Sequence, residues 1–127
     1  MDRNIESLIA EAPLSAHLAT AVENRPHVAP VWYDYHEGHL RVLTGGRKRE
    51  NVERNPKVAV SIERADGPAV EWSVTLLGTA RIVDDTERVR EVSRRINRKY
   101  RNTDEADDAD GGVLLDIEIG SASAQRY

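Results

Sequence analysis

The chain has 127 residues, a formal net charge of −4 and no cysteine. This length predicts one domain spanning residues 1–127, and the missing cysteine excludes disulfides, thiolate metal sites and cysteine nucleophiles. With no signal sequence and no long apolar run, we expect a soluble, cytoplasmic protein, and its acidic balance disfavours nucleic-acid binding.

The first half of the chain predicts a short helix followed by three strands. Ile5, Leu8, Ile9 and Ala12 recur at helical spacing before Pro13. Strands follow over 15–22, 27–35 and 40–43, separated by polar turns at 23–26 and 36–39. The first two strands are expected to form a hairpin.

The second half predicts a helix over 47–55, a strand over 58–62 and a turn at 66–68. A long strand over 70–82 alternates apolar and polar residues, and Gly78 within it indicates a bulge or a sharp bend. The next helix is predicted with an Asp84/Glu87 capping box. Its apolar stripe consists of Val89, Val92, Ile96 and Tyr100. A mobile acidic loop over 102–112, a strand over 113–119 and a small-residue tail complete the chain.

Six strands in adjacent hairpins with few helices favour a mainly β fold with peripheral helices, built as an antiparallel barrel. Helices do not alternate with strands throughout, so a parallel α/β sheet is disfavoured.

Several charged groups are better explained by solvated surfaces than by sites. The pair His36 and His39 lacks the further ligands of a metal centre, and the acidic stretch 104–110 lacks the calcium-loop register. The basic stripe of Arg94, Arg98 and Arg101 suits a solvated helix face better than a phosphate contact. We therefore predict no metal site.

The segment Thr44-Gly45-Gly46-Arg47-Lys48 has the composition of an anion site. It combines a hydroxyl, two glycines, two cations and a helix start, whose unsatisfied N–H groups attract phosphate. Walker spacing is absent. Residue chemistry alone leaves two interpretations equally open, a phosphate site and an ordinary basic helix start.

The surrounding sequence resembles a known family. The runs His17–Thr20, Arg25–Tyr33, Thr44–Val60 and Trp72–Arg81 follow one another as in the pyridoxamine 5′-phosphate oxidase-like FMN-binding split-barrel family. This resemblance implies an antiparallel split β-barrel and a homodimer with FMN at the subunit interface. A small-molecule substrate and no membrane association are expected.

The resemblance also implies site residues. Thr44, Arg47 and Lys48 would hold the FMN phosphate, with Gly46 at the helix start. The flavin-facing strand residues would be Pro30, Val31 and Trp32, and the partner subunit would contribute Trp72 and Ser73. Asn51 matches a residue that is frequent in the family's helix, and it either contributes to the cofactor site or has a structural role. For Trp32 and Trp72, core packing is the alternative to contact with the flavin.

Departures from the family narrow the expected activity. Gly46 replaces a serine, Asp34 replaces a basic residue, and residues 119–127 lack the substrate-gripping Trp and Arg of the oxidase. True pyridoxamine-phosphate oxidase activity is therefore not expected.

An FMN-dependent oxidoreductase, with hydride transfer at flavin N5, is the function we predict. Catalytic residues and the substrate are not identified. A deazaflavin coenzyme is the alternative cofactor. A non-catalytic module that stores or senses flavin or haem is the second alternative. Nucleic-acid binding through residues 47–54 and the basic stripe that begins at Arg94 is the third.

Overall fold

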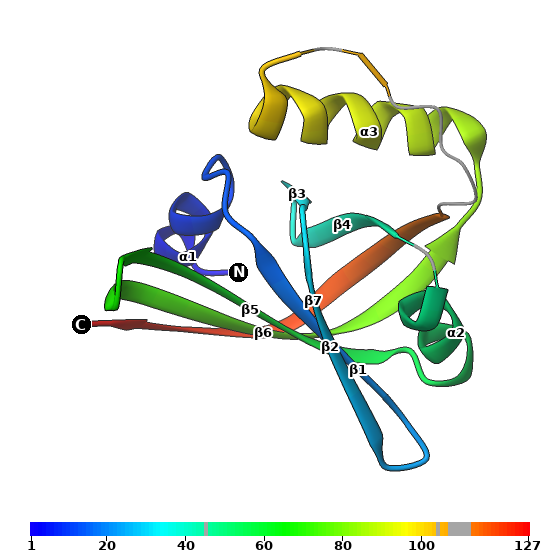
Figure 1. Cartoon of the computed structure of the whole chain (residues 1–127), viewed down its shortest axis with the longest axis horizontal. Helices are drawn as coiled ribbons and strands as arrows, with labels where there is room; N and C mark the ends of the chain where they lie inside the picture. Colours follow the sequence, from blue (N-terminus) through cyan, green and yellow to red (C-terminus); the bar gives the residue numbers. More distant parts are fainter. Residues whose placement is uncertain (45, 104, 107–112) are drawn as a thin grey trace.

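The computed structural model describes residues 1–44, 46–103, 105–106 and 113–127 and is drawn in Figure 1. In chain order the elements are α1 (Arg3–Ile9), β1 (Ala16–Val22), β2 (Arg25–Val31), β3 (Asp34–His36), β4 (His39–Thr44), α2 (Gly46–Arg54), β5 (Lys57–Asp66), β6 (Ala69–Val83), α3 (Thr86–Arg101) and β7 (Val113–Arg126). All strand pairs are antiparallel, so the predicted mainly β class with peripheral helices is confirmed.

The strands form one sheet in the order β2-β1-β5-β6-β7-β4-β3. Its two edges, β2 and β3, are separated in the chain by only Trp32 and Tyr33. This connection spans at most about 10 Å, so the sheet must curl until its edges approach one another. The result is a barrel split between β2 and β3. Pro26 and Pro30 both lie in the edge strand β2, where a missing N–H is tolerated.

The prediction of six strands was wrong, because the predicted strand 27–35 is two strands. β2 pairs with β1, whereas β3 pairs with β4 at the other edge of the sheet. Trp32 and Tyr33 cross from one edge to the other, and pairing stops there. The continuous β-forming composition of the segment did not show this break.

The last strand is also longer than predicted, since β7 continues through the small-residue tail to Arg126. The long strand β6 supplies a partner for each of the residues 121–126, including Leu76 for Ala122 and Val74 for Ala124, and only Gly120 is skipped. The predicted bulge is confirmed by a register shift between Leu77 and Gly78. A Cβ at Gly78 would lie 2.6 Å from the Glu118 carbonyl oxygen, so the crossing strand requires glycine there.

Helix ends differ slightly from the predictions. α1 ends at Ile9, before the expected Ala12, and α2 begins and ends one residue early. The N-cap of α3 is Asp85 rather than Asp84, because its carboxylate accepts hydrogen bonds from the N–H groups of Glu87 and Arg88. Most of the predicted acidic loop, residues 104 and 107–112, lies outside the described residues.

Two hydrophobic clusters organise the molecule. The barrel core fills the curled sheet and includes the fully buried Leu18, Ile62 and Leu115. The smaller α3 core joins one face of α3 to β7 and consists of Val89, Val92, Ile96 and Leu114. Figure 1 shows α3 as a separate layer over one side of the barrel. Among the described residues, no helix is long and apolar enough to span a membrane.

Candidate functional site

A cavity of about 280 Å³ lies between the barrel and α3. We call it the α3 cavity. Its wall comes from the ends of β2 and β4, the first turn of α2 and the inner face of α3. It is lined by Pro30, Val31, Trp32, Leu43, Thr44, Lys48, Ser93, Ile96, Asn97 and Arg101.

Half of the predicted site residues meet in this cavity. Pro30 and Val31 end β2 and Trp32 follows directly, Thr44 ends β4, and Lys48 lies in the first turn of α2. They are separated by up to 18 positions in sequence, and the closure of the barrel brings them together. The structure therefore places the predicted ring-facing strand beside the predicted phosphate segment.

The first turn of α2 has the geometry of an anion site. β4 ends at Thr44 and α2 begins at Gly46, so the first N–H groups of the helix have no partner within it. Lys48 is half-buried beside them, whereas Arg47 is exposed and lines a neighbouring groove. An anion over this turn would meet helix N–H groups between two cations.

Asn51 has a structural contact of its own. Its Nδ2 donates to Thr20 Oγ1 on β1 at 2.9 Å, and one helical turn later Asn55 Nδ2 donates to the Ala21 carbonyl at 2.9 Å. These bonds hold α2 against the barrel and so fix the direction of its N-terminus. Asn51 lines the groove of Arg47 and not the α3 cavity.

Trp32 forms an aromatic wall at the cavity mouth. Its ring stacks on Tyr100 of α3, with centroids 4.6 Å apart and planes 7° from parallel. The guanidinium carbon of Arg101 lies 5.2 Å from the centroid of the same ring. Trp32 nevertheless keeps 40% of its surface exposed, whereas the other tryptophan, Trp72, is 6% exposed. A planar ligand has an aromatic surface to contact there.

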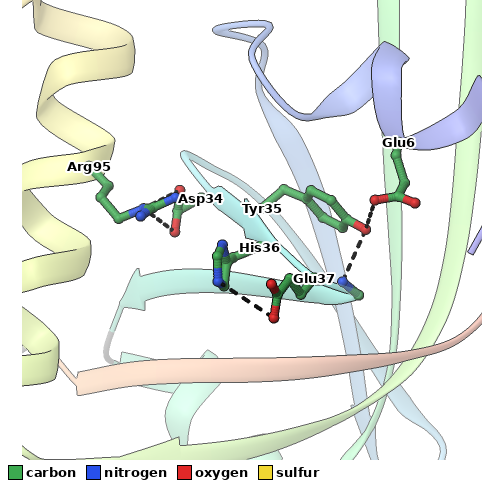
Figure 2. A network of polar contacts seen from close by, with 7 residues as sticks. Glu6, Asp34, Tyr35, His36, Glu37 and Arg95 are labelled. Atoms are coloured by element: carbon green, nitrogen blue, oxygen red, sulfur yellow. Dashed lines mark hydrogen bonds and ion pairs between the residues drawn. The ribbon is translucent and has the colours of Figure 1, made fainter. Parts of the chain in front are cut away.

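α3 is held to the barrel through the short crossing segment after β2. Arg95 Nε contacts both carboxylate oxygens of Asp34 at 3.1 and 3.2 Å, as Figure 2 shows. Lys99 Nζ donates to the Tyr33 carbonyl at 3.3 Å and lies 3.5 Å from the centre of the Tyr33 ring. Tyr100 OH donates to the Leu14 carbonyl at 2.5 Å. These contacts fix the distance between α3 and the cavity floor.

Burial changes the protonation of the residues in this attachment. It lowers the pKa of Lys99 to about 8, against the opposing attraction of Asp34 and Glu11. Burial also raises the pKa of Tyr100 to about 12 and that of Tyr33 further. The two phenols are therefore neutral at physiological pH, while the amine is close enough to its pKa to lose its proton in mild base.

The predicted residues Trp72 and Ser73 do not reach the α3 cavity of their own chain. They lie at the start of β6 beside the end of β7, on the side of the barrel away from α2 (Figure 1). Trp72 is buried in the barrel core, and Ser73 Oγ lies 3.4 Å from the Tyr127 hydroxyl. Their predicted contact with a partner's cofactor remains a prediction.

Sequence reasoning missed the contribution of α3. Ser93 and Asn97 are polar, only 3% and 2% exposed, and one helical turn apart. They interrupt the apolar side of the helix at the cavity, and Asn97 Nδ2 also donates to the Glu105 carbonyl at 2.8 Å. Two uncharged polar residues beside Val92 and Ile96 were the available signal. Arg101 was assigned to a solvated face, yet it lines the cavity.

The turn histidines have local partners. His39 Nδ1 lies 2.7 Å from Asp116 Oδ1, and His36 Nε2 lies 3.8 Å from Glu37. Figure 2 shows His36 and Glu37 beside Tyr35, whose hydroxyl donates to Glu6 at 2.9 Å. Within the described part of the chain, no three His, Asp or Glu side chains gather in a way that could hold a metal ion.

Comparison with known proteins gives one family match. The family model described as pyridoxamine 5′-phosphate oxidase matches residues 2–126, which is nearly the whole chain. No curated protein sequence matches. The similar solved structures include an F420 reductase, with 26% identity, a TM-score of 0.78, and coverage of 97% of this chain and 98% of that one.

Two further structures show the same fold at lower identity. The Mycobacterium tuberculosis protein Rv2991 has a TM-score of 0.82 at 21% identity, covering 99% of this chain and 85% of that one. A FAD-binding protein from Mesorhizobium loti has a TM-score of 0.76 at 20% identity, covering 98% and 94%. The chain therefore belongs to the pyridoxamine 5′-phosphate oxidase-like family of flavin-binding split barrels, as the succession of sequence motifs predicted.

Proposed function

We propose that the α3 cavity binds the ring of a phosphorylated flavin, FMN in the simplest case, and that the protein is a flavin-dependent oxidoreductase. One observation carries this proposal: Trp32, Thr44 and Lys48, from the crossing after β2, the end of β4 and the start of α2, line the same cavity. An aromatic and apolar wall suits a flavin ring, and a cation at a helix N-terminus suits its phosphate.

The residues present fit such a group. Pro30 and Val31 offer apolar surface, Trp32 offers a ring face, and Thr44 offers a hydroxyl close to the α2 N-terminus. At about 280 Å³ the cavity is just below the range for small-ligand pockets, about 300–1,000 Å³. One chain therefore encloses part of a flavin, and a second chain would have to cover the rest.

A bound flavin would accept or donate a hydride at N5. The chain's contribution is then to bind and orient the ring. Lys48 and the α2 N–H groups hold the phosphate end, Trp32 fixes one face of the ring, and α3 limits access of water from above. Ser93 and Asn97 offer uncharged hydrogen-bonding groups inside the cavity and are the candidates for substrate contact.

A homodimer is supported by an apolar hollow on the outside of the sheet. This hollow has a volume of about 660 Å³ and includes Ala59, Leu77 and Gly78. Leu77 is 54% exposed, and Val28 on β2 is 64% exposed. A second copy of the chain would cover these side chains, and in that arrangement Ser73 is better exposed than the buried Trp72 to approach a partner's cofactor.

A deazaflavin-dependent reductase is the second candidate, because the F420 reductase shares 26% identity over nearly the full length of both chains. A flavin store without turnover is the third. Both would use the same cavity, so the cofactor and its turnover must be measured.

The test is to purify the full chain without added cofactor, record its visible spectrum and identify any released ligand by mass. We expect bound flavin or uptake of added FMN, with reduction of the bound flavin by a nicotinamide donor. Thr44→Ala should lower the affinity for FMN about tenfold, because one hydroxyl contact is lost. Thr75→Ala, at an exposed threonine, should leave this affinity unchanged. A protein that takes up neither FMN nor the deazaflavin coenzyme would refute the proposal.

A further inference from the structure

A second hollow lies where α3, the end of α1 and the start of β3 meet. We call it the attachment hollow. It has a volume of about 300 Å³ and is lined by Ala10, Glu11, Asp34, Tyr35, Arg95, Arg98 and Lys99. Among the described residues, none lines both this hollow and the α3 cavity. The polar attachment of α3 therefore borders a separate space, large enough for a small molecule.

Lys99 supplies an amine to the attachment hollow. Its Nζ donates to the Tyr33 carbonyl at 3.3 Å and lies 3.5 Å from the centre of the Tyr33 ring. Arg95, Arg98, Asp34 and Glu11 are the charged side chains that line the hollow beside it. Both carboxylates attract the ammonium and so oppose the effect of burial on the pKa of Lys99. The amine is therefore within electrostatic reach of the groups that line the hollow.

Burial makes this amine a better nucleophile at neutral pH than an ordinary lysine. It lowers the pKa of Lys99 to about 8. At pH 7.5 about a quarter of such amines carry no charge, against about one in a thousand at the ordinary pKa of 10.5. A desolvated lysine beside other cationic groups is one form of activated nitrogen nucleophile. Conversion of the amine to an uncharged amide would also remove the cost of burying its charge.

Two guanidinium groups border the same hollow. Arg95 lies one helical turn before Lys99, on the same side of α3. Its contacts with Asp34 both use Nε, so its Nη groups are not committed to that carboxylate. Arg98 is the second. Among the described lining residues, three cationic side chains share the hollow with two carboxylates, of which Asp34 is paired with Arg95 and Glu11 is exposed to water. This balance favours a small phosphate.

We propose that the attachment hollow is a modification site, where small acyl phosphates acylate Lys99. Arg95 and Arg98 would bind the phosphate and so bring the acyl carbon to Nζ. The neutral amine attacks this carbon, a C–N bond forms, and the bond from the carbon to the bridging oxygen breaks. Phosphate leaves with the electron pair of that bond, and one amine proton passes to water. This inference does not depend on a bound flavin.

The test is a timed reaction of the full chain with acetyl phosphate at pH 7.5, followed by digestion and mass spectrometry. The chain has three lysines, Lys48, Lys57 and Lys99, and cleavage after glutamate leaves each in a separate peptide. Lys57 is the reference, because it is exposed and lies outside the attachment hollow. We expect Lys99 to be acetylated about tenfold faster than Lys57, since its larger uncharged fraction outweighs its restricted access. A rate at Lys99 equal to or below that at Lys57 would overturn the proposal.

Binding of the phosphate is tested with two further measurements on the unaltered protein. Inorganic phosphate, added at constant ionic strength, should slow the acetylation of Lys99 several-fold and leave that of Lys57 unchanged. With p-nitrophenyl acetate, an uncharged acetyl donor, the preference for Lys99 should be smaller, and inorganic phosphate should not alter it. An equal preference with both donors, or no protection by phosphate, would overturn the acyl phosphate site.

A variant then tests the guanidinium group. Arg98→Gln should slow the reaction of Lys99 with acetyl phosphate several-fold and leave its reaction with the uncharged donor within about twofold. Arg94→Gln, at an exposed arginine outside the hollow, is the matched control and should change neither rate. An equal loss with both donors in Arg98→Gln would contradict a phosphate contact at this residue. Failure of the protein to bind a flavin would refute the proposed function and leave this site standing.

Discussion

The barrel core and the α3 core differ in how much apolar surface they bury and in what holds them together. Fully buried residues such as Leu18, Ile62 and Leu115 fill the barrel. α3 rests on three apolar residues against Leu114 and on the stack of Tyr100 with Trp32, and polar contacts of Arg95 and Lys99 complete its attachment. The α3 cavity lies at this boundary. Its floor therefore belongs to the firmly packed part of the molecule and its roof to a more weakly attached helix.

The largest expected effect compares the same substitution in the two cores. Ile62→Ala in the barrel should lower the free energy of unfolding by about 4 kcal/mol, and Ile96→Ala in the α3 core by about 2 kcal/mol, because a thin layer can close around the lost volume. Urea unfolding of both variants measures the difference. Equal losses would contradict the distinction between the cores.

A smaller effect is expected from the ion pair that attaches α3. Asp34→Ala removes the carboxylate that pairs with Arg95, whose side chain is 42% exposed. This change should lower the free energy of unfolding by about 1–2 kcal/mol. Amide hydrogen exchange should then rise in α3 and stay slow in β5 and β6. The exposed Asp84→Ala serves as the control. Uniform loss of protection across the barrel would show that α3 is not a separate unit.

The smallest expected effect is a dependence of stability on pH. The folded pKa of Lys99, about 8, lies below its ordinary value of 10.5, so the unfolded chain binds more protons between these pH values. Stability should therefore rise from pH 8 to pH 10, by about 1 kcal/mol once the partial exposure of the amine is allowed for. Above pH 10 it should fall, because the raised pKa of Tyr33 and Tyr100 keeps both phenols neutral only in the fold.

Urea unfolding at pH 7.5 and pH 9.5 measures this change, with Lys99→Met as the control. The rise should disappear in the variant. A stability that falls between the two pH values in the unaltered protein would contradict the stated environment of Lys99.

Residue spacing along the chain was enough to predict several elements of the fold. The alternation along β6, the bulge at Gly78 and the apolar stripe of α3 all follow from residue spacing, and the structure confirms them. The crossing at Trp32 and Tyr33 depends on the closure of the whole barrel, which residue spacing does not encode. The end of β7 depends on its partner strand, since small residues such as Ser121 and Ala124 have weak strand preference of their own.

The residues of the candidate site also fall into two groups, those that the sequence predicted and those that it did not. The strand and phosphate segments were predicted because family motifs mark them, and the structure brings Trp32, Thr44 and Lys48 together. Ser93 and Asn97 were missed, because their one signal, two uncharged polar residues beside Val92 and Ile96, does not distinguish a cavity lining from the solvated edge of an amphipathic helix. Arg47 and Lys48 line different hollows because consecutive helix residues point about 100° apart, and this became visible only in the structure.

The most direct test of the central claim compares FMN with riboflavin in the Arg47→Ala/Lys48→Ala variant. The unaltered protein should bind FMN about a hundredfold more tightly than riboflavin, because only FMN carries the phosphate for these cations. The variant should lose most of this preference while keeping its riboflavin affinity. Arg3→Ala/Arg88→Ala, which removes two exposed arginines elsewhere, should behave as the unaltered protein. Equal loss of both ligands, or no loss of either, would contradict a flavin phosphate at the first turn of α2.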